Sequence, residues 1–340
     1  MRQVWISRRG TPDVLEVREA PDPTPQSGEI RIRVAFAGVN FADLLARMGL
    51  YQDAPKIPCV VGYEVSGVVD AVGDGVGESW IGSRVVSATH FGGYSDTVCL
   101  PATHATPLPP TVSDEEAAAL PVNYLTAHHM LVYLGAVRPN DIVLVHGAAG
   151  GVGQAAVQLC HIVGARVLGT ASAPKHEFLR SVGVEPIDYR DSSWPDRVRD
   201  LTKGRGVDIA LDAIGGRSFK TSFDLLAPAG RLYCYGVSAM VGSERPSLLR
   251  ALGSLLRTPR FGPIKLMMKN RGVAGVNLGQ LLGEPAILRP QFDALMDYAA
   301  NEQIKPVIDH VYSFGDASAA HMRLHARQNI GKVLLTPHTL

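Results

Sequence analysis

The spacing of apolar and polar residues divides the chain into three stretches. From Gln3 to about Thr106, short β-type runs are separated by glycines, and Glu29–Val34 alternates charged and apolar residues as a half-buried strand does. Within this stretch only "FADLLARMG" has the pattern of a helix. These features predict a compact, irregular β domain.

Beyond Pro139, strand and helix patterns alternate strictly, which is typical of a parallel, doubly wound sheet. The predicted strands are 141–147, 165–170, 184–190, 207–214 and 231–237, and the predicted helices are 152–164, 174–183, 194–204 and 218–230. Gly164, Gly183 and Gly230 stand where three of these helices are expected to end. From residue 301 a strand, short helix and strand pattern returns, so we expect this tail to fold back onto the first domain.

A change of pattern near residue 113 begins an alanine-rich helix, and the domain boundary is expected just after that helix. Ser113, with Glu116 three positions later, forms a capping box ahead of an alanine-rich helix, and a second helix is expected over 121–135. A chain of 340 residues suits two domains. We predict a β-rich domain from residues 1–122 and 300–340, and a doubly wound α/β domain from residues 123–299.

Composition excludes several classes of protein. The formal net charge is +1, which disfavours a nucleic-acid partner. The four cysteines lie tens of residues apart without a C-x-x-C pair, which argues against a disulfide framework or a structural zinc site. The amino terminus has no apolar signal region, and no stretch reaches the ~18 apolar residues of a membrane span. We therefore expect a reduced, soluble, cytoplasmic protein.

The stretch "VHGAAGGVG" follows the first strand of the alternating region and opens its first helix, where a dinucleotide-binding turn is expected. Ala148 replaces the first glycine of the usual G-x-G-x-x-G pattern. A P-loop is excluded because Gln154 and Ala155 follow the last glycine. The alternative is a turn that needs glycine for packing alone. The residues predicted to bind the pyrophosphate are Ala149, Gly150, Gly151, Val152 and Gly153.

The end of the second predicted strand indicates which dinucleotide binds. An acidic residue there would accept from the ribose hydroxyls of NAD, but this chain has Thr170, Ser172 and Lys175. A hydroxyl and an ammonium suit the 2′-phosphate of NADPH. Tyr189, at the end of the third strand, can add a second hydroxyl or be a half-buried strand aromatic. NADPH is thus the expected cofactor.

Several stretches together resemble the zinc-free quinone oxidoreductase branch of the medium-chain dehydrogenase/reductase superfamily, which includes the zeta-crystallins. They are "GVNFADLLARMGLY", "VVGYEVSGVV", "AAALPVNYLTAHHML", "VLVHGAAGGVGQAAVQL", "GTASAPKHEFLRSVG", "IDYR" and "GKVLL". "RPSLLRALGSLLRTP" and "GVAGVNLGQLL" are similar to the synaptic-vesicle membrane protein subgroup. The resemblance implies a GroES-like catalytic domain, a Rossmann domain, and a homodimer formed by edge strands, for which "RGVAGVNLG" is the candidate here.

Two positions depart from the zinc-dependent members of this superfamily. Those members have a cysteine ligand and a Gly-His-Glu motif, where this chain has Asn40 in "GVNFAD" and Tyr63 in "VGYE". Without a thiolate or an imidazole at these positions, a tetrahedral zinc site cannot form there. We expect a zinc-independent enzyme.

The resemblance also implies the catalytic residues. Asn40 is expected to donate to the developing oxyanion or to hold the ribose, and Tyr51 to shape the site or donate a proton. Asp43 is the third candidate, although its place before "LLARMG" also suits a structural helix cap. Solvent is the alternative proton source.

Further cofactor-binding residues follow from family position and from the ends of the predicted strands. Two of these candidates also have a structural interpretation: Thr126 as a helix-interior threonine bonded to its own backbone, and Lys332 as a surface lysine. His128 and His129 are adjacent helix residues that point in different directions, so they cannot share a ligand and are interpreted as structural. The later His310, His321 and His325 lack carboxylate partners at ligand spacing and are interpreted in the same way. The added candidates are Thr126, Gly215, Tyr235, Gly236, Val237, Asn277, Asn329 and Lys332.

A basic segment between Val237 and Gly272 predicts an amphipathic helix. Its leucines 248, 252, 255 and 256 share one helical face, and its basic residues are Arg245, Arg250, Arg257, Arg260, Lys265, Lys269 and Arg271, with Glu244 as the single acid. The favoured interpretation is a lid whose leucines cover the substrate cleft or a dimer seam. The alternative is contact with an anionic membrane surface.

These features predict an NADPH-dependent reductase of quinones or α,β-unsaturated carbonyls. A conjugated acceptor needs no metal, because the charge left by hydride addition spreads onto a distant oxygen. One alternative is an enoyl reductase of acyl thioesters. A non-enzymatic alternative is an NADPH-binding scaffold at membranes.

Overall fold

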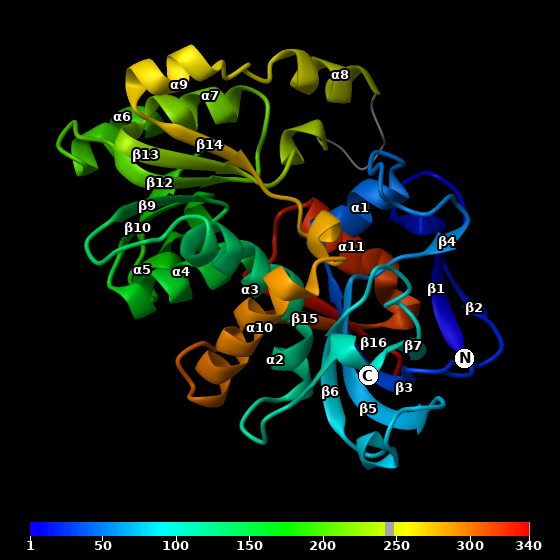
Figure 1. Ribbon diagram of the computed structural model, residues 1–340. Helices are drawn as coiled ribbons and strands as arrows, with labels where there is room; N and C mark the ends of the chain where they lie inside the picture. Colours follow the sequence, from blue (N-terminus) through cyan, green and yellow to red (C-terminus); the bar gives the residue numbers. More distant parts are fainter. Residues whose placement is uncertain (242–247, 340) are drawn as a thin grey trace. The chain divides into compact units, whose positions relative to one another are not determined.

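The computed structural model describes residues 1–241 and 248–339, which divide into two units. The first unit comprises Met1–Asn123 and the chain from Gly279 onward, and the second comprises the described residues from Tyr124 to Leu278 (Figure 1). The helices of the first unit are α1 (Phe41–Arg47), α2 (Asp114–Ala118), α10 (Pro285–Ala300) and α11 (Ala317–His325). Helix α3 (Pro121–His128) runs across the boundary between the units.

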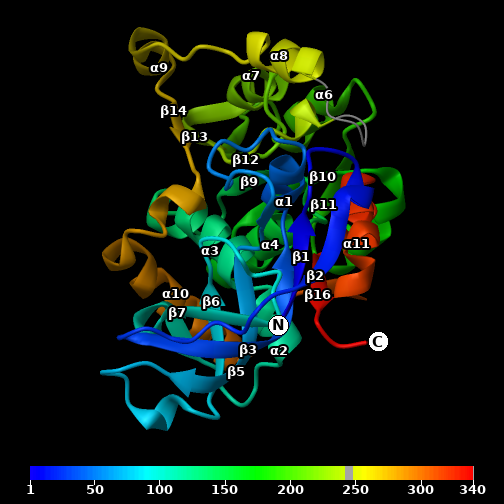
Figure 2. The same cartoon turned by 90° about the vertical axis from the view of Figure 1, so that its right-hand side faces the viewer.

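A seven-stranded sheet is the main element of the first unit. Its order is β15-β16-β3-β5-β6-β8, with β7 also paired to β3. Ile30, Ile32 and Val34 of β3 are buried and the residues between them are more exposed, as the alternation predicts. The strands are β3 (Glu29–Val39), β5 (Glu64–Val72), β6 (Arg84–Ala88), β7 (Thr97–Pro101), β8 (Ala105–Pro107), β15 (Ile308–Ser313) and β16 (Lys332–Thr336). Beside them lies a sheet of β2 (Leu15–Glu19), β1 (Arg2–Ile6) and β4 (Cys59–Val60) (Figure 1), of which Figure 2 shows β1 and β2 from another side.

The C-terminal tail completes this sheet. Strand β16 pairs antiparallel with β3, with Leu334 opposite Gly38, and parallel with β15. Helix α11 lies between β15 and β16 in the sequence, and its residues Ala317 and Ala320 belong to the core that contains Leu44 of α1. The predicted return of the tail to the N-terminal part is therefore confirmed. It brings Lys332 beside the start of α1.

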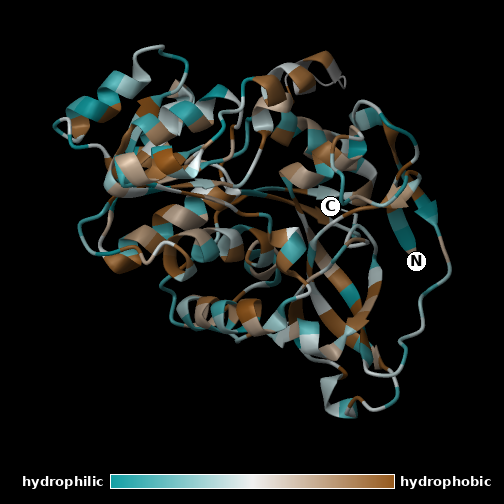
Figure 3. Ribbon diagram, turned by 45° about the horizontal axis from the view of Figure 1, so that its top comes forward, coloured by the Kyte–Doolittle hydropathy of each residue, from teal (hydrophilic) through white to brown (hydrophobic). Residues whose placement is uncertain are grey.

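The second unit contains a six-stranded sheet in which every neighbouring pair is parallel, as predicted. The order is β11-β10-β9-β12-β13-β14. The strands are β9 (Ile142–His146), β10 (Arg166–Ala171), β11 (Glu185–Asp188), β12 (Val207–Asp212), β13 (Leu226–Cys234) and β14 (Gly272–Gly275). The helices are α4 (Gly151–Val163), α5 (His176–Ser181), α6 (Trp194–Leu201), α7 (Arg217–Asp224), α8 (Leu248–Leu256) and α9 (Pro263–Lys269). This is the Rossmann arrangement. Hydrophilic and hydrophobic residues alternate along the helices in Figure 3.

Two of the predicted helices differ most clearly from those in the structure. The helix predicted over 218–230 ends at Asp224, and Gly230 lies inside β13 rather than at a helix end. The reason is that Pro228 cannot continue a helix and Leu226 already pairs with Val207 of β12. The helix predicted over 121–135 is α-helical to His128 and continues as a π turn over His129–Tyr133.

Candidate active site

Asn40 lies where β3 ends and α1 begins. Its backbone N–H donates to Asp43 Oδ2 at 2.8 Å, so Asp43 makes the helix cap that the sequence allows. Gly62 N–H donates to Asp43 Oδ1 at 3.2 Å. The fully buried carboxylate thus joins the start of α1 to the loop before β5.

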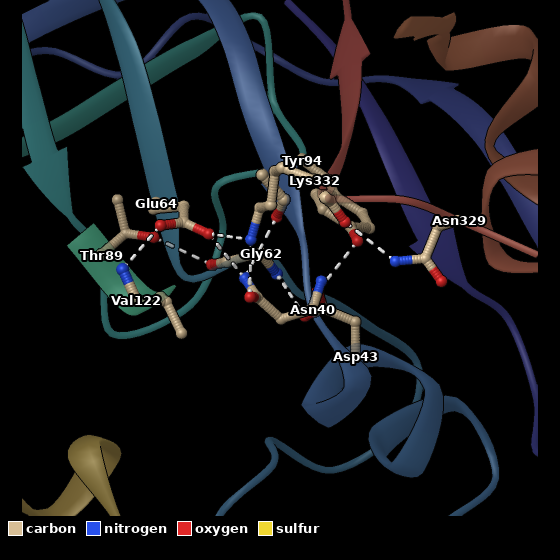
Figure 4. A network of polar contacts seen from close by, with 11 residues as sticks. Asn40, Asp43, Gly62, Glu64, Thr89, Tyr94, Val122, Asn329 and Lys332 are labelled. Carbon is tan, nitrogen blue, oxygen red and sulfur yellow. Dashed lines mark hydrogen bonds and ion pairs between the residues drawn. The ribbon is translucent and has the colours of Figure 1, made fainter. Parts of the chain in front are cut away.

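The side chains of Asn40, Glu64 and Lys332 form one buried polar group, which we call the Glu64 cluster (Figure 4). Lys332 Nζ donates to Asn40 Oδ1 at 2.6 Å and to Glu64 Oε1. Asn40 Nδ2 donates to Glu64 Oε1 at 2.8 Å, and Val122 N–H donates to Glu64 Oε2 at 2.7 Å. Lys332 is 3% exposed, so its interpretation as a surface lysine is wrong.

The structure adds two residues that sequence reasoning missed, Glu64 and Tyr94, and it gives His321 a partner. Glu64 follows Tyr63 in "VGYE" and gave no signal of a partner, because Lys332 is far away in sequence. Tyr94 donates its hydroxyl to Asp43 Oδ2 at 2.9 Å and lies 3.3 Å from His321 Nε2. His321, interpreted from its spacing as lacking a carboxylate partner, thus reaches one through Tyr94.

Burial controls the protonation of these groups. It raises the pKa of Asp43 to about 7, against the lowering effect of the hydrogen bonds from Asn40 and Tyr94 and of the Lys332 charge. It raises the pKa of Tyr63 and Tyr94, and it lowers the pKa of His321 well below its ordinary value. The two phenols and the imidazole are therefore neutral near pH 7.

The raised pKa of Asp43 predicts a pH-dependent stability. The folded state holds the Asp43 proton more tightly than the unfolded state, so the stabilisation is complete below about pH 4. It declines as pH rises toward the folded pKa of about 7 and is constant above it. The variant Asp43→Asn cannot titrate, so the Tm of the wild type minus that of the variant is expected to fall between pH 4 and 7. A difference that is flat or rises over this range contradicts the assignment.

Tyr51 belongs to an aromatic group on the same unit. Its ring lies edge-on to that of Tyr63, with centroids 6.2 Å apart, and Tyr63 packs on Phe91 at 5.1 Å. Tyr51 is half-buried, whereas Tyr63 is 6% exposed. Tyr51 is thus the more accessible phenol of the pair.

The glycine turn of the second unit has the geometry of an anion cradle. Gly147 has a φ of +66°, and Gly150 caps α4, whose first-turn N–H groups have no partner within the helix. A Cβ on Gly153 would lie 2.4 Å from Gly147 O, so only glycine lets α4 approach the turn this closely. Ala148 and Ala149 are buried beneath it. Of the five predicted pyrophosphate residues, Ala149 and Gly150 end the turn, and Gly151, Val152 and Gly153 begin α4, an arrangement that suits a phosphate group.

The ends of β10 and β11 bring Ser172, Lys175 and Tyr189 to one edge of the sheet. Ala171 pairs with Asp188, and Tyr189 N–H donates to Ala171 O at 3.4 Å. Ser172 and Lys175 are half-buried, and Tyr189 is 36% exposed, so both the cofactor contact and its alternative as a half-buried strand aromatic stay predictions. The guanidinium of Arg190, which the sequence analysis did not select, lies 5.9 Å from the Tyr189 ring centroid.

The remaining predicted cofactor residues belong to several elements of the two units. A Cβ on Gly215 would lie 3.2 Å from Val237 Cα, so these two strand ends meet. Tyr235 and Gly236 belong to the same edge, while Asn277 is exposed after β14. Thr126 is buried in α3, and Thr170 is 1% exposed and bonds to His146. In the first unit, Asn329 Nδ2 donates to Gly331 O at 2.8 Å.

The basic segment forms two helices, α8 and α9. Glu244 and Arg245 lie outside the described residues, as do the side chains of Leu248 and Arg250. The other leucines of the predicted face, Leu252, Leu255 and Leu256, are 53%, 60% and 78% exposed. The rest of the second unit does not bury them, and their predicted role of covering a substrate cleft or a dimer seam stays a prediction. Ile264, Met267 and Met268 of α9 are exposed as well.

Two family profiles match this chain. One, described as an alcohol dehydrogenase GroES-like domain, covers residues 26–110, and one described as a zinc-binding dehydrogenase covers residues 151–301. The synaptic vesicle membrane protein VAT-1 homolog of Danio rerio is 41% identical over 95% of this chain, which spans 66% of that protein. The crystal structure of the human VAT-1 homolog-like protein has a TM-score of 0.87 at 34% identity, covering 100% of this chain and 99% of the other.

The chain belongs to the medium-chain dehydrogenase/reductase superfamily. The crystal structure of the Escherichia coli quinone oxidoreductase complexed with NADPH is also similar, with a TM-score of 0.86 at 28% identity, covering 99% of this chain and 100% of that one. The predicted combination of GroES-like and Rossmann parts is therefore confirmed.

One of the two family profiles is described as a zinc-binding dehydrogenase, but the residues present in this chain do not fit a zinc ion. Asn40 and Tyr63 offer an amide and a phenol, and the Lys332 ammonium already bonds to both Asn40 and Glu64. A cation beside a buried ammonium is disfavoured by charge repulsion. In the part of the chain that the structure describes, no three His, Cys, Asp or Glu side chains gather as metal ligands. None of the described helices combines the length and hydropathy of a membrane span.

Proposed function

We propose that this chain is a cytoplasmic, NADPH-dependent and zinc-independent oxidoreductase of quinones or α,β-unsaturated carbonyls. The observation that carries the proposal is the anion cradle at α4, together with Ser172 and Lys175 at the end of β10 in place of an acid. The quinone oxidoreductase complexed with NADPH supports both the cofactor and the acceptor. The four free cysteines are consistent with a reducing compartment.

Each unit has a defined task in this proposal. Bound NADPH supplies a hydride, which adds to a carbon of the conjugated acceptor. The α4 N–H groups bind the pyrophosphate, and Ser172 and Lys175 bind the 2′-phosphate. In the first unit Asn40 is held by Lys332 and Glu64, so its amide is oriented before substrate binds. Tyr51 or solvent donates the proton that the reduced oxygen takes up.

A single assay separates this proposal from its alternatives. NADPH oxidation is followed with a quinone, an enone and a crotonyl thioester, then with NADH in place of NADPH and after chelation. We expect turnover of the quinone or the enone that chelation leaves unchanged. Activity confined to the thioester would favour an enoyl reductase, and NADPH binding without turnover would favour a scaffold. Loss of activity on chelation contradicts zinc independence.

The variant Lys175→Ala is expected to raise KM for NADPH by about ten- to a hundredfold and to leave KM for NADH unchanged. The lost interaction is a charge-assisted hydrogen bond to the 2′-phosphate, worth about 1.5–3 kcal/mol. Lys269→Ala, which removes an exposed lysine of α9, is the control and should leave both constants unchanged. Equal increases for the two cofactors in Lys175→Ala would exclude a 2′-phosphate contact.

We further propose that the second unit forms a homodimer through the free edge of β14 and the exposed apolar residues of α8. Strand β14 pairs only with β13 in the described sheet, and an unpaired edge strand is a ready surface for pairing. Light scattering should give about twice the chain mass of 36.4 kDa, and Leu255→Glu with Leu256→Glu should shift it toward the monomer. A monomeric wild type that sediments with anionic vesicles would instead support the membrane alternative.

A further inference from the structure

Four polar side chains lie almost fully buried in the second unit, beneath the carboxyl ends of its strands. They come from β10, β9, α7 and β12, and none is more than 3% exposed. We call this group the His146 chain; its members are Thr170, His146, Ser222 and Asp212. Groups of this kind lose hydration on folding and are retained only when each finds a partner.

Hydrogen bonds join the members of the His146 chain in one line. His146 Nδ1 lies 3.0 Å from Thr170 Oγ1, and His146 Nε2 lies 2.9 Å from Ser222 Oγ. Ser222 Oγ in turn lies 2.7 Å from Asp212 Oδ2. No water is needed to complete the line, because every separation is that of a direct hydrogen bond.

The chemistry of the groups assigns every proton in this line. The Asp212 carboxylate only accepts, so the Ser222 hydroxyl donates to it and itself accepts from His146 Nε2–H. Burial lowers the pKa of His146, so the ring is neutral and carries no second N–H. Nδ1 therefore accepts from the Thr170 hydroxyl. All hydrogen bonds then point the same way, an arrangement in which each bond strengthens the next.

Both ends of the His146 chain bind backbone. At one end, Gly147 N–H donates to Thr170 Oγ1 at 3.4 Å. At the other end, Ile214 N–H and Gly215 N–H donate to Asp212 Oδ1 at 2.8 and 3.3 Å. Gly147 and Gly215 both have positive φ, of +66° and +82°, a conformation that glycine adopts without steric cost. They follow β9 and β12, which are neighbours in the sheet.

We propose that the His146 chain is a positioning relay that holds the Gly147 turn and the Gly215 loop in register for the dinucleotide. The proposal rests on NADPH binding as the proposed function. It gives Thr170 a different task from the direct cofactor contact predicted from the sequence: Thr170 acts through the backbone that it holds. The members of the relay are thus positioning residues, and breaking it at one end should disturb the loop at the other.

The test uses Thr170→Val, which removes the hydroxyl and keeps the branched shape, with Thr170→Ser as the conservative variant. Hydrogen exchange is measured at the Gly147 and Gly215 amides in the full chain without cofactor. Thr170→Val is expected to speed exchange at both amides by about tenfold, the effect of losing one hydrogen bond, and Thr170→Ser to restore protection. NADPH affinity should fall by a similar factor in Thr170→Val and recover in Thr170→Ser.

Ser218→Ala is the matched control. Ser218 donates to Asp212 Oδ2 at 2.7 Å but does not lie on the line to His146, so its loss should leave Gly147 exchange unchanged. If Thr170→Val speeds exchange at Gly147 alone, the two ends are independent and the relay is overturned. A wild type that does not bind NADPH would refute the proposed function, and the exchange at Gly215 would still decide the relay.

Discussion

Lys332→Met is expected to lower the free energy of unfolding by about 3–5 kcal/mol, because it leaves the Glu64 carboxylate buried without its counter-charge. Glu64 is 0% exposed, and its remaining donors are one side-chain amide and the Val122 N–H. Those neutral donors cannot replace an ammonium. Equilibrium urea unfolding measures the loss, read from a signal of the first unit such as the fluorescence of Trp5 and Trp80.

Two controls show whether the loss comes from the buried charge. The double variant Glu64→Gln with Lys332→Met removes both charges and should recover most of the stability, since a neutral buried pair carries no uncompensated charge. Lys305→Met removes an 82% exposed lysine that lies 3.8 Å from Glu116, and it should cost less than about 1 kcal/mol. If Lys332→Met costs no more than Lys305→Met, the Glu64 cluster does not stabilise the first unit.

Gly153→Ala is expected to weaken NADPH binding by a hundredfold or more. The added Cβ would lie 2.4 Å from Gly147 O and 2.7 Å from the Ala148 backbone, and backbone atoms cannot move away as a side chain can. Helix α4 must therefore shift away from the turn, and its N–H groups leave the position at which they face the phosphate. Titration of NADPH fluorescence measures the change.

The matched control is Gly262→Ala, because a Cβ on Gly262 meets nothing within 4 Å. This variant should bind NADPH as the wild type does. Far-UV circular dichroism of Gly153→Ala should remain close to that of the wild type, which distinguishes a displaced helix from an unfolded unit. Unchanged NADPH affinity in Gly153→Ala would show that the cradle does not bind the pyrophosphate.

The Rossmann part could be predicted from sequence because its signals are local. Each strand and helix carries its own period, and the glycines stand at the turn between β9 and α4. Ser172 and Tyr189 could be selected because carboxyl ends of parallel strands meet at one edge.

The Glu64 cluster could not be predicted for the opposite reason. Asn40, Glu64 and Lys332 come from three distant segments, and they meet only because β16 pairs with β3 beside β5. The hydrophobic pattern within a single strand or helix does not predict that pairing. A lysine near the end of a chain looks like a surface residue until the sheet that buries it is known.

The amphipathic pattern of the basic segment predicted α8 but not its surroundings. A helical period shows which residues share a face, and it does not show whether that face is covered by the same chain. The exposure of Leu255 and Leu256 is therefore information that only the structure provides.

The position of β16 has a consequence for the order in which the chain can fold during synthesis. All six strands of the second unit lie before residue 276, so its sheet can be complete while the last segment is still being made. The main sheet of the first unit has to wait for Lys332–Thr336, and Glu64 has no ammonium partner until then. The first unit thus begins to be made before the second unit but completes its sheet after it. Until β16 pairs with β3, that edge of β3 is exposed, and it is the segment that a chaperone would need to protect.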